Sequence, residues 1–203
     1  MFEDRRWTML DDLHLGSEFF RSLVAVDEAV TRRVAAEGCP VCNGPLHRSD
    51  YDRKPRGALI APAGEAFVRR FSLCCGREGC RKRVTPPSVR FLGRRVYLGA
   101  VVIVASIVAL ALRSAAEIRR QTGVPARTTR RWLGWWQGPL LHTEVFVSIC
   151  ARLIGVDVGR VPASIVDRLM GTGTQRVRTM LEWLAPLTTG SVPDGSRFLR
   201  GTA

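Results

Sequence analysis

The spacing of apolar residues predicts that most of this chain is helical. In residues 17–37 apolar side chains recur at roughly helical intervals: Phe20, Leu23, Val24, Val30 and Val34. Ser17 and Glu18 form a plausible helix start, and Gly38 a plausible end. An amphipathic helix is therefore expected over residues 17–37, just before the first cysteine, Cys39.

Residues 39–95 follow a different pattern, with many turn-forming glycines and prolines. Two stretches, 46–53 and 65–74, are candidate strands and predict a small hairpin-based module. From residue 139 onward we expect short helices near 140–154, 163–170 and 174–184, followed by a tail containing Gly, Ser and Pro.

Between these regions, residues 96–112 form an uncharged run flanked by Arg94, Arg95 and Arg113. Seventeen apolar residues are the lower limit for a membrane span. The alternative is a buried first helix of a helix-turn-helix that starts directly afterwards. A helix in lipid cannot also cover the apolar faces of the two helices after it, so the sequence favours the buried helix.

Residues 114–137 have the cadence of a helix-turn-helix. Gly123 is suited to the turn, because a positive φ costs little without a Cβ, and Pro125 suits a first helical turn. The side chains expected to face inward are Ala116, Ile118, Thr122, Val124, Thr129, Trp132 and Leu133. Those expected to project outward from the second helix are Arg127, Thr128, Arg130 and Arg131. Arginine and threonine at such positions can contact base edges or phosphates.

Two cysteine pairs, Cys39 with Cys42 and Cys75 with Cys80, have the spacing of a four-cysteine zinc ribbon. Four available thiolates argue for a closed, structural Zn²⁺ site rather than a catalytic one. Cys74 is an alternative to Cys75, although a ligand cysteine followed by glycine is the more usual geometry. His47 is an alternative ligand if one cysteine does not bind.

Charge changes the functional picture more than the other bulk properties. The 203 residues carry a formal net charge of +13, and nearly all basic residues are arginines, as a GC-rich genome would also produce. The location of the arginines is therefore more informative than their number. Residues 113–131 hold six arginines against Glu117, and residues 77–95 hold seven basic residues against Glu78. Clustered basic charge of this kind predicts a nucleic-acid partner. The residues of the second cluster expected to contact phosphates are Arg81, Lys82, Arg83, Arg94 and Arg95.

Three segments together resemble a known group of proteins: CPVCNGPL, CCGREGCRKRVTPPSVRF and EIRRQTGVPARTTRRWLGWW. They are similar to the zinc-ribbon and helix-turn-helix DNA-binding proteins of bacterial insertion sequences, and to N-terminal modules of some transposases. The resemblance covers about residues 39–137. It implies structural zinc on Cys39, Cys42, Cys75 and Cys80, and a recognition helix from Ala126 to Gln137. Thr122 and Thr129 depart from it, because such motifs commonly have aliphatic residues there.

Catalysis is not expected. A transposase catalytic domain, with its carboxylate triad on an RNase H-like sheet, is larger than the 65 residues that follow Gly138. The acids in that region show no strand-borne pattern, and the three histidines, His14, His47 and His142, are scattered.

The sequence thus predicts a mainly α fold with a small β zinc ribbon and a three-helix core of the helix-turn-helix type. The expected segments are an N-terminal helical segment (1–38), a zinc ribbon with a basic extension (39–95), a helix-turn-helix (96–138) and a C-terminal helical region with a tail (139–203).

We expect a non-catalytic, sequence-specific double-stranded DNA-binding protein that acts as a transposition accessory or transcriptional regulator of a mobile element. A transposase or integrase subunit and a second copy of the chain are further candidate partners. The N-terminus, Met1 to Asp12, does not resemble a secretory signal, so a cytoplasmic, nucleoid-associated protein is expected. The alternatives are a membrane-anchored zinc-ribbon protein and an RNA or protein interaction module.

Overall fold

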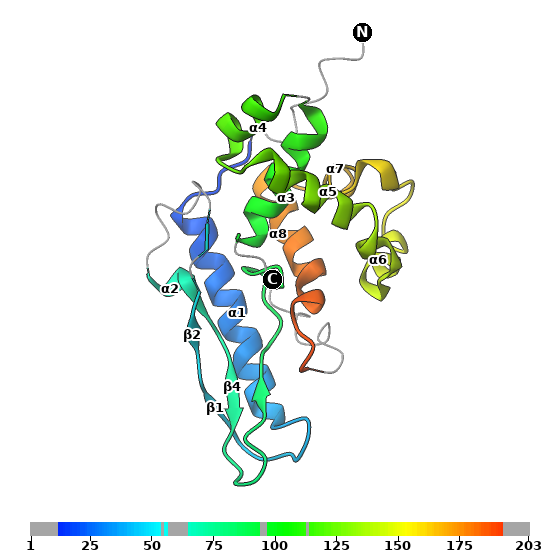
Figure 1. Cartoon of the computed structure of the whole chain (residues 1–203). Coiled ribbons are helices and arrows are strands. Elements are labelled where there is room, and N and C mark those ends of the chain that lie inside the picture. The colour runs from blue at the N-terminus through cyan, green and yellow to red at the C-terminus, as the bar shows by residue number, and fades with distance from the viewer. Residues whose placement is uncertain (1–11, 54, 57–64, 94–96, 113, 193–203) are drawn as a thin grey trace. The chain divides into compact units, whose positions relative to one another are not determined.

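The computed structural model describes residues 12–53, 55–56, 65–93, 97–112 and 114–192, which are mainly helical with a small antiparallel sheet (Figure 1). The chain divides into two compact units. Among the described residues, those within 16–56, 65–98 and 182–192 form one unit, here called the cysteine unit. Those within 12–15 and 99–181 form the other, the helical unit.

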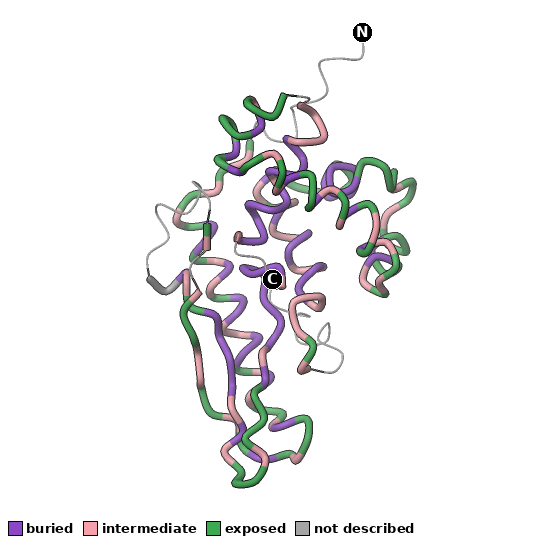
Figure 2. The backbone as a smooth tube through the Cα atoms, in the orientation of Figure 1, coloured by how far each residue is buried: buried purple, intermediate pink, exposed green. Residues whose placement is uncertain are grey.

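The cysteine unit is built on a long amphipathic helix, α1 (Ser17–Glu37), as the apolar spacing predicted. Its buried stripe includes Phe20, Leu23, Val30 and Val34, whereas Val24 is only half-buried. The helix ends at Gly38, whose N–H donates to the carbonyl of Ala35. The purple face of α1 in Figure 2 is this buried stripe.

The sheet has three short antiparallel strands in the order β1 (Leu46–Arg48), β4 (Leu73–Cys75) and β5 (Arg83–Val84). A second antiparallel pair is formed by β2 (Tyr51–Asp52) and β3 (Arg69–Arg70). In the first sheet Leu46 pairs with Cys75, and Leu73 pairs with Val84. The register therefore places Cys75, from the second cysteine pair, beside Leu46, which lies four residues after Cys42 of the first pair.

The prediction of a strand over 65–74 is wrong for its first four residues, which form the short helix α2 (Glu65–Val68). The cause is tertiary packing. Phe67 and Phe71 are both buried, and the Phe67 ring lies 4.7 Å from that of Phe20 on α1 in an edge-on contact. Pattern alone does not separate a short helical turn from a strand when the same aromatic residues must reach one helix.

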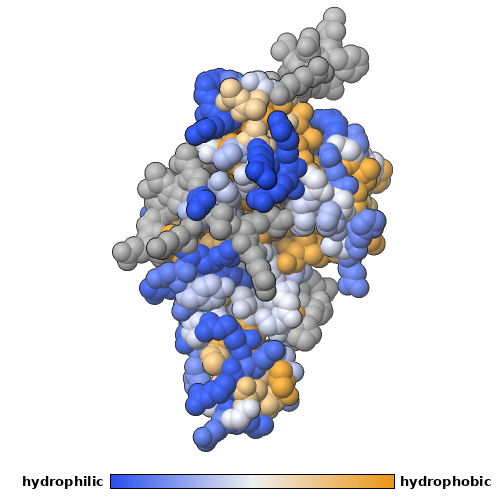
Figure 3. Space-filling view, viewed as in Figure 1, coloured by the Kyte–Doolittle hydropathy of each residue, from blue (hydrophilic) through white to orange (hydrophobic). Residues whose placement is uncertain are grey.

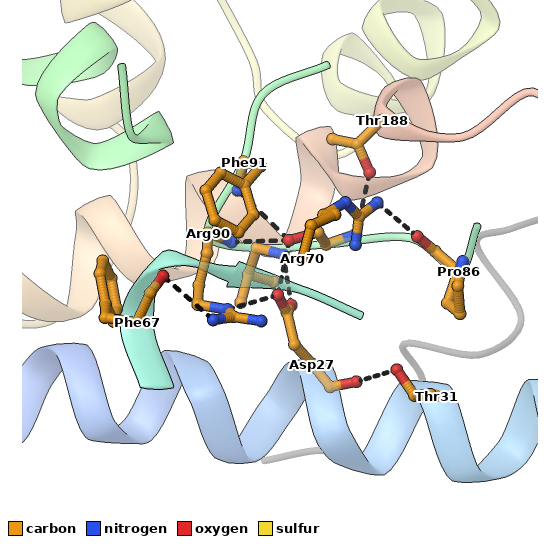
Figure 4. Close-up of polar contacts among 10 residues, drawn as sticks. Asp27, Thr31, Phe67, Arg70, Pro86, Arg90, Phe91 and Thr188 are labelled. Carbon is orange, nitrogen blue, oxygen red and sulfur yellow. Dashed lines mark hydrogen bonds and ion pairs between the residues drawn. The ribbon is translucent and has the colours of Figure 1, made fainter. Parts of the chain in front are cut away.

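A buried ion pair connects α1 to the segment that follows β5 (Figure 4). The Asp27 carboxylate accepts hydrogen bonds from Arg90 Nε at 2.8 Å and from the Val89 N–H at 2.7 Å. It also accepts one from the Ser88 hydroxyl at 2.5 Å. Since both side chains of the ion pair are fully buried, these hydrogen bonds compensate for the lost hydration of the charges.

Two buried arginines surround this carboxylate. The Arg90 guanidinium lies 4.4 Å from the centre of the Phe71 ring and donates to the carbonyl of Phe67. Arg70 Nη2 donates to the carbonyl of Pro86 at 2.6 Å. Burial lowers the pKa of Arg70, while the charge of Asp27 acts in the opposite direction. Arg90 was counted among the basic residues of the 77–95 cluster, but it holds the core together and offers no charge to a partner.

The helical unit is organised around α3 (Gly99–Ala111), which is in contact with α4 (Ala115–Thr122), α5 (Ala126–Trp136) and α7 (Ala163–Val166). Residues 99–103 and 105–108 of α3 are buried. The prediction of a buried helix within 96–112 is therefore confirmed as a helix over 99–111, of which residues 109–111 are only half-buried. Among the described residues, no helix has both the length and the apolar character needed to cross a bilayer.

The region after α5 consists of short helices, as predicted, but with shorter spans. They are the 3-10 helix η3 (Pro139–His142), α6 (Glu144–Cys150), the 3-10 helix η4 (Val158–Arg160), α7 and α8 (Gly173–Leu184). The boundary between the two units falls within α8, after Leu181. The 3-10 helix η5 (Ala185–Thr188) follows, and Thr188 accepts a hydrogen bond from the Ser88 N–H inside the cysteine unit.

Candidate metal centre and basic helix

The four cysteines of the two pairs converge on one point. The Sγ atoms of Cys39 and Cys80 are 3.8 Å apart, and those of Cys42 and Cys75 are 3.5 Å apart. All four sulfur atoms lie within 4.8 Å of one another, and none belongs to a disulfide. The arrangement predicted from the spacing is thus present.

Local backbone structure brings the pairs together. The first pair follows the end of α1, where the Cys39 N–H donates to the Gly44 carbonyl and closes a tight loop. A Cβ on Gly44 would lie 3.2 Å from the Cys75 sulfur and 3.3 Å from the Cys42 sulfur, so a side chain here would crowd both thiols. The second pair begins at the end of β4, where the Arg77 N–H donates to Cys75 Sγ.

These distances fit a tetrahedral metal ion. A Zn–S bond of about 2.3 Å places tetrahedral sulfur ligands about 3.8 Å apart. The contacts in the cluster lie close to this value, and two of the four cysteines are buried. The cluster is therefore compatible with a closed metal site with no position left open for a substrate.

The neighbouring thiols and the backbone shift the pKa values of three of these cysteines. Hydrogen bonding from the Val41 N–H lowers the pKa of Cys39 to about 7. The Arg77 N–H lowers the pKa of Cys75, but burial and the neighbouring thiols outweigh it and raise that pKa to about 12. At Cys80 the hydrogen bond from the Lys82 N–H lowers the pKa, but the neighbouring thiols of Cys42 and Cys39 and burial outweigh it, so the pKa of Cys80 is raised. Since adjacent thiolates repel one another, a cation is needed for all four to be ionised together.

Both alternative ligands lie outside the cluster. Cys74 points away from it, and its sulfur lies 3.6 Å from the carbonyl of Arg81. His47 is exposed and its ring lies over Gly76 rather than among the thiols. The choice of Cys75 over Cys74 is therefore confirmed as far as membership of the cluster is concerned.

The predicted phosphate-binding residues of the cysteine unit differ in how freely they can bind. Arg81 and Lys82 are exposed directly after Cys80, and Arg81 has a positive φ of 45°. Arg83 is also exposed, but its guanidinium donates to the Ser49 carbonyl and the Ser72 hydroxyl, both at 3.0 Å, and so links β5 to residues next to β1 and β4. Arg94 and Arg95 lie outside the described residues.

In the helical unit, α4 and α5 are joined by a three-residue turn. Ser114 caps α4 by accepting the Glu117 N–H, and Gly123 ends it with a left-handed φ of 66°. Val124, in the turn, is completely buried, as predicted. Pro125 precedes α5, and its carbonyl accepts the N–H groups of Thr128 and Thr129.

The inner faces of these helices follow the prediction except at Ala116. Ile118, Thr122, Thr129 and Trp132 are buried, and Leu133 is half-buried. Ala116 is exposed because it lies two residues before Ile118, about 200° away around a helix with 3.6 residues per turn. Both threonines are accommodated because their hydroxyls donate to helix carbonyls, those of Ile118 and Ala126.

One anchoring contact was not foreseen in the sequence. Trp136 is completely buried, and its indole N–H donates to the Ser106 hydroxyl on α3 at 2.9 Å. The signal for it was present, because Thr129, Trp132 and Trp136 share a helical face. The hydroxyl partner 30 residues away could not be read from that spacing.

The outer face of α5 is basic. Arg127, Arg130 and Arg131 are exposed, and Thr128 is half-buried. Within the described part of the chain, the three guanidiniums make no hydrogen bond or ion pair. In Figure 2 exposed and buried residues alternate along α5, as expected for a helix that packs on α3 with one side only.

Comparison with known proteins adds no relative: no protein-family model matches the chain, and neither curated proteins nor solved structures give a significant match.

Proposed function

We propose that this chain is a non-catalytic, sequence-specific double-stranded DNA-binding protein in which α3, α4 and α5 act as a helix-turn-helix. The observation that carries the proposal is the two-sided character of α5. One side buries Thr129, Trp132 and Trp136, and the other exposes arginines that have no partner among the described residues.

The placement of the arginines supports a role for α5 in recognising the base sequence. In a helix-turn-helix the N-terminal part of the second helix enters the major groove, and its side chains contact base edges. Arg127 lies in the first turn of α5, and Arg131 lies one turn later on the same side. Arginine can donate two hydrogen bonds to guanine, and Thr128 and Arg130 are suited to neighbouring base or phosphate contacts.

The cysteine unit has a supporting role in this proposal. Zn²⁺ on the four cysteines would fix the loop that presents Arg81 and Lys82, and these side chains would bind phosphates. Arg83 contributes less to DNA binding, because its guanidinium already donates three hydrogen bonds to Ser49 and Ser72 of the cysteine unit.

The biological setting rests on the resemblance to insertion-sequence proteins. We propose a transposition accessory or a transcriptional regulator of a mobile element, with a transposase or integrase subunit as a second partner. A metal ion held by all four thiols would have no open coordination position, so we propose a structural role for this cluster rather than a catalytic one.

Selection from a random pool tests the proposal. The zinc-loaded full chain is incubated with random-sequence duplexes, and bound DNA is recovered and sequenced over several rounds. An enriched motif that unlabelled RNA does not displace supports specific duplex binding. Equal retention of all sequences, or preferential displacement by RNA, would contradict it and favour an RNA interaction module.

A further inference from the structure

The exposed side of α5 holds three arginines and, between them, a glycine. Arg127, Arg130, Arg131 and Gly134 are all exposed, and at about 100° per residue they lie within an arc of about 100° around the helix axis. Gly134 lies inside this arc, about 20° from Arg127, about 40° from Arg130 and about 60° from Arg131. Hydrophilic side chains cover the region of α4 and α5 in Figure 3, which has the orientation of Figure 1. Gly134 is therefore surrounded by the basic face of the helix.

The fold of the described residues gives no reason for a glycine at position 134. Only proline is less favourable than glycine inside a helix, and Gly134 lies in the third turn of α5. A Cβ at this position would meet no neighbouring group within 4 Å, so no packing contact requires the glycine. Gly138 is different, because a Cβ there would lie 2.9 Å from the carbonyl oxygen of Gly134. Gly134 thus weakens the helix without an internal contact that explains it.

The charge and the size of the exposed face indicate what approaches Gly134. The sequence of α5 contains no acidic residue, and within the described residues its arginines make no hydrogen bond or ion pair, so the face suits a polyanion. An α-helix with its side chains is about 10–12 Å across, and the major groove of B-DNA is about 12 Å wide. A helix in this groove fits closely, so the middle of its exposed face comes nearest to the bases. Glycine allows the closest approach to a helix backbone.

We propose that Gly134 is a positioning residue for DNA recognition. Without a side chain at this position, α5 enters the major groove deeply enough for the arginines on either side of Gly134 to reach base edges. A Cβ would hold the helix away from the bases and would lengthen the contacts of Arg130 and Arg131 together. Phosphate contacts depend less on this depth, because phosphates line the rim of the groove. The inference rests on the proposed function, since it concerns the same helix.

Folding stability and DNA affinity should respond to Gly134 in opposite directions. In the zinc-loaded full chain, Gly134→Ala should raise Tm by roughly 2–4 °C, because alanine favours the helix. The same substitution should weaken binding to the duplex recovered by selection about tenfold, and Gly134→Leu should weaken it about 100-fold, since each tenfold loss matches one weakened arginine–base contact. Binding to a scrambled duplex should change little. Ala36→Leu is the matched control and should leave both affinities unchanged, because Ala36 is an exposed helical residue of the cysteine unit.

A double-mutant cycle tests the positioning role itself. Arg131→Ala removes one of the contacts that Gly134→Ala weakens, so Gly134→Ala should cost less affinity in the Arg131→Ala chain than in wild type. The inference is overturned if Gly134→Ala binds the selected duplex as tightly as wild type, if it lowers Tm, or if its effect adds fully to that of Arg131→Ala. A wild-type chain that enriches no duplex sequence contradicts the proposed function, and this inference with it.

Discussion

Two sets of side-chain interactions organise the cysteine unit, and only one of them was predictable from the sequence. The clustering of the four cysteines was predicted from their spacing alone, because two short loops that each carry two cysteines are typical of metal sites. The pair Asp27 and Arg90 was not predicted, since an aspartate inside an amphipathic helix gives no sign of a partner 63 residues later. Burial of a charge is a tertiary property that local pattern does not encode.

The metal prediction concerns the thiols directly. Chain purified under reducing conditions should contain about one zinc ion, and Cys39→Ser with Cys42→Ser should lose it and unfold the cysteine unit. Cys74→Ser is the matched control and should retain the metal, because Cys74 lies outside the cluster. Metal affinity should fall as the pH is lowered, since protons compete with the ion for thiolates. Metal analysis and titration with a chromophoric chelator give both results.

The buried ion pair predicts a large loss of stability. Asp27→Asn should lower the free energy of unfolding by roughly 3–5 kcal/mol, because it leaves Arg90 buried without its counter-ion. The exposed pair of Asp52 and Arg69 is the control, and Asp52→Asn should cost less than about 1 kcal/mol. Urea unfolding of the zinc-loaded proteins measures both. Equal effects would show that the Asp27 contact is not the one that holds α1 to the segment after β5.

At the scale of elements, the helices were predicted better than the strands. The apolar period of 17–37 fixed α1, and the uncharged run indicated α3, because long periodic segments leave few alternatives. The strands are only two or three residues long, and α2 replaced part of one. Their positions depend on the cysteine cluster and on contacts with α1, neither of which has a period in the sequence. The inward face of α4 was misplaced at Ala116, because Ile118 and Thr122 define the buried side of this eight-residue helix and Ala116 lies about 200° from Ile118.

The contact between α3 and α5 gives an element-scale prediction. Ser106→Ala should lower the free energy of unfolding by roughly 1–3 kcal/mol, because the Trp136 indole N–H is left buried without an acceptor. Trp136→Phe should cost less stability in a chain that already carries Ser106→Ala than in the wild-type chain. In the Ser106→Ala chain it removes an indole N–H that has no acceptor. A double-mutant cycle by chemical denaturation measures this coupling. Additive effects would mean that the hydrogen bond does not join the two helices.

For the whole molecule, the distribution of charge is the property on which the proposed function depends. The sequence places the basic residues in two clusters, but it could not separate arginines with exposed side chains from those used internally. Arg90 is in the core and Arg83 connects strands, whereas Arg81, Arg127 and Arg131 are exposed. Arg81, Arg127 and Arg131 are therefore expected to dominate DNA binding, each in a different way.

The most direct test of sequence-specific reading by α5 is a binding titration at several salt concentrations, against a selected duplex and a scrambled one. Arg127→Ala and Arg131→Ala should each cost roughly 1–3 kcal/mol on the selected duplex and much less on the scrambled one, because a base contact is lost. Arg81→Ala should weaken both duplexes alike and reduce the salt slope by about one, as expected for one phosphate contact. If the Arg127 and Arg131 variants lose equal affinity for both duplexes, α5 contacts only phosphates and does not recognise a sequence.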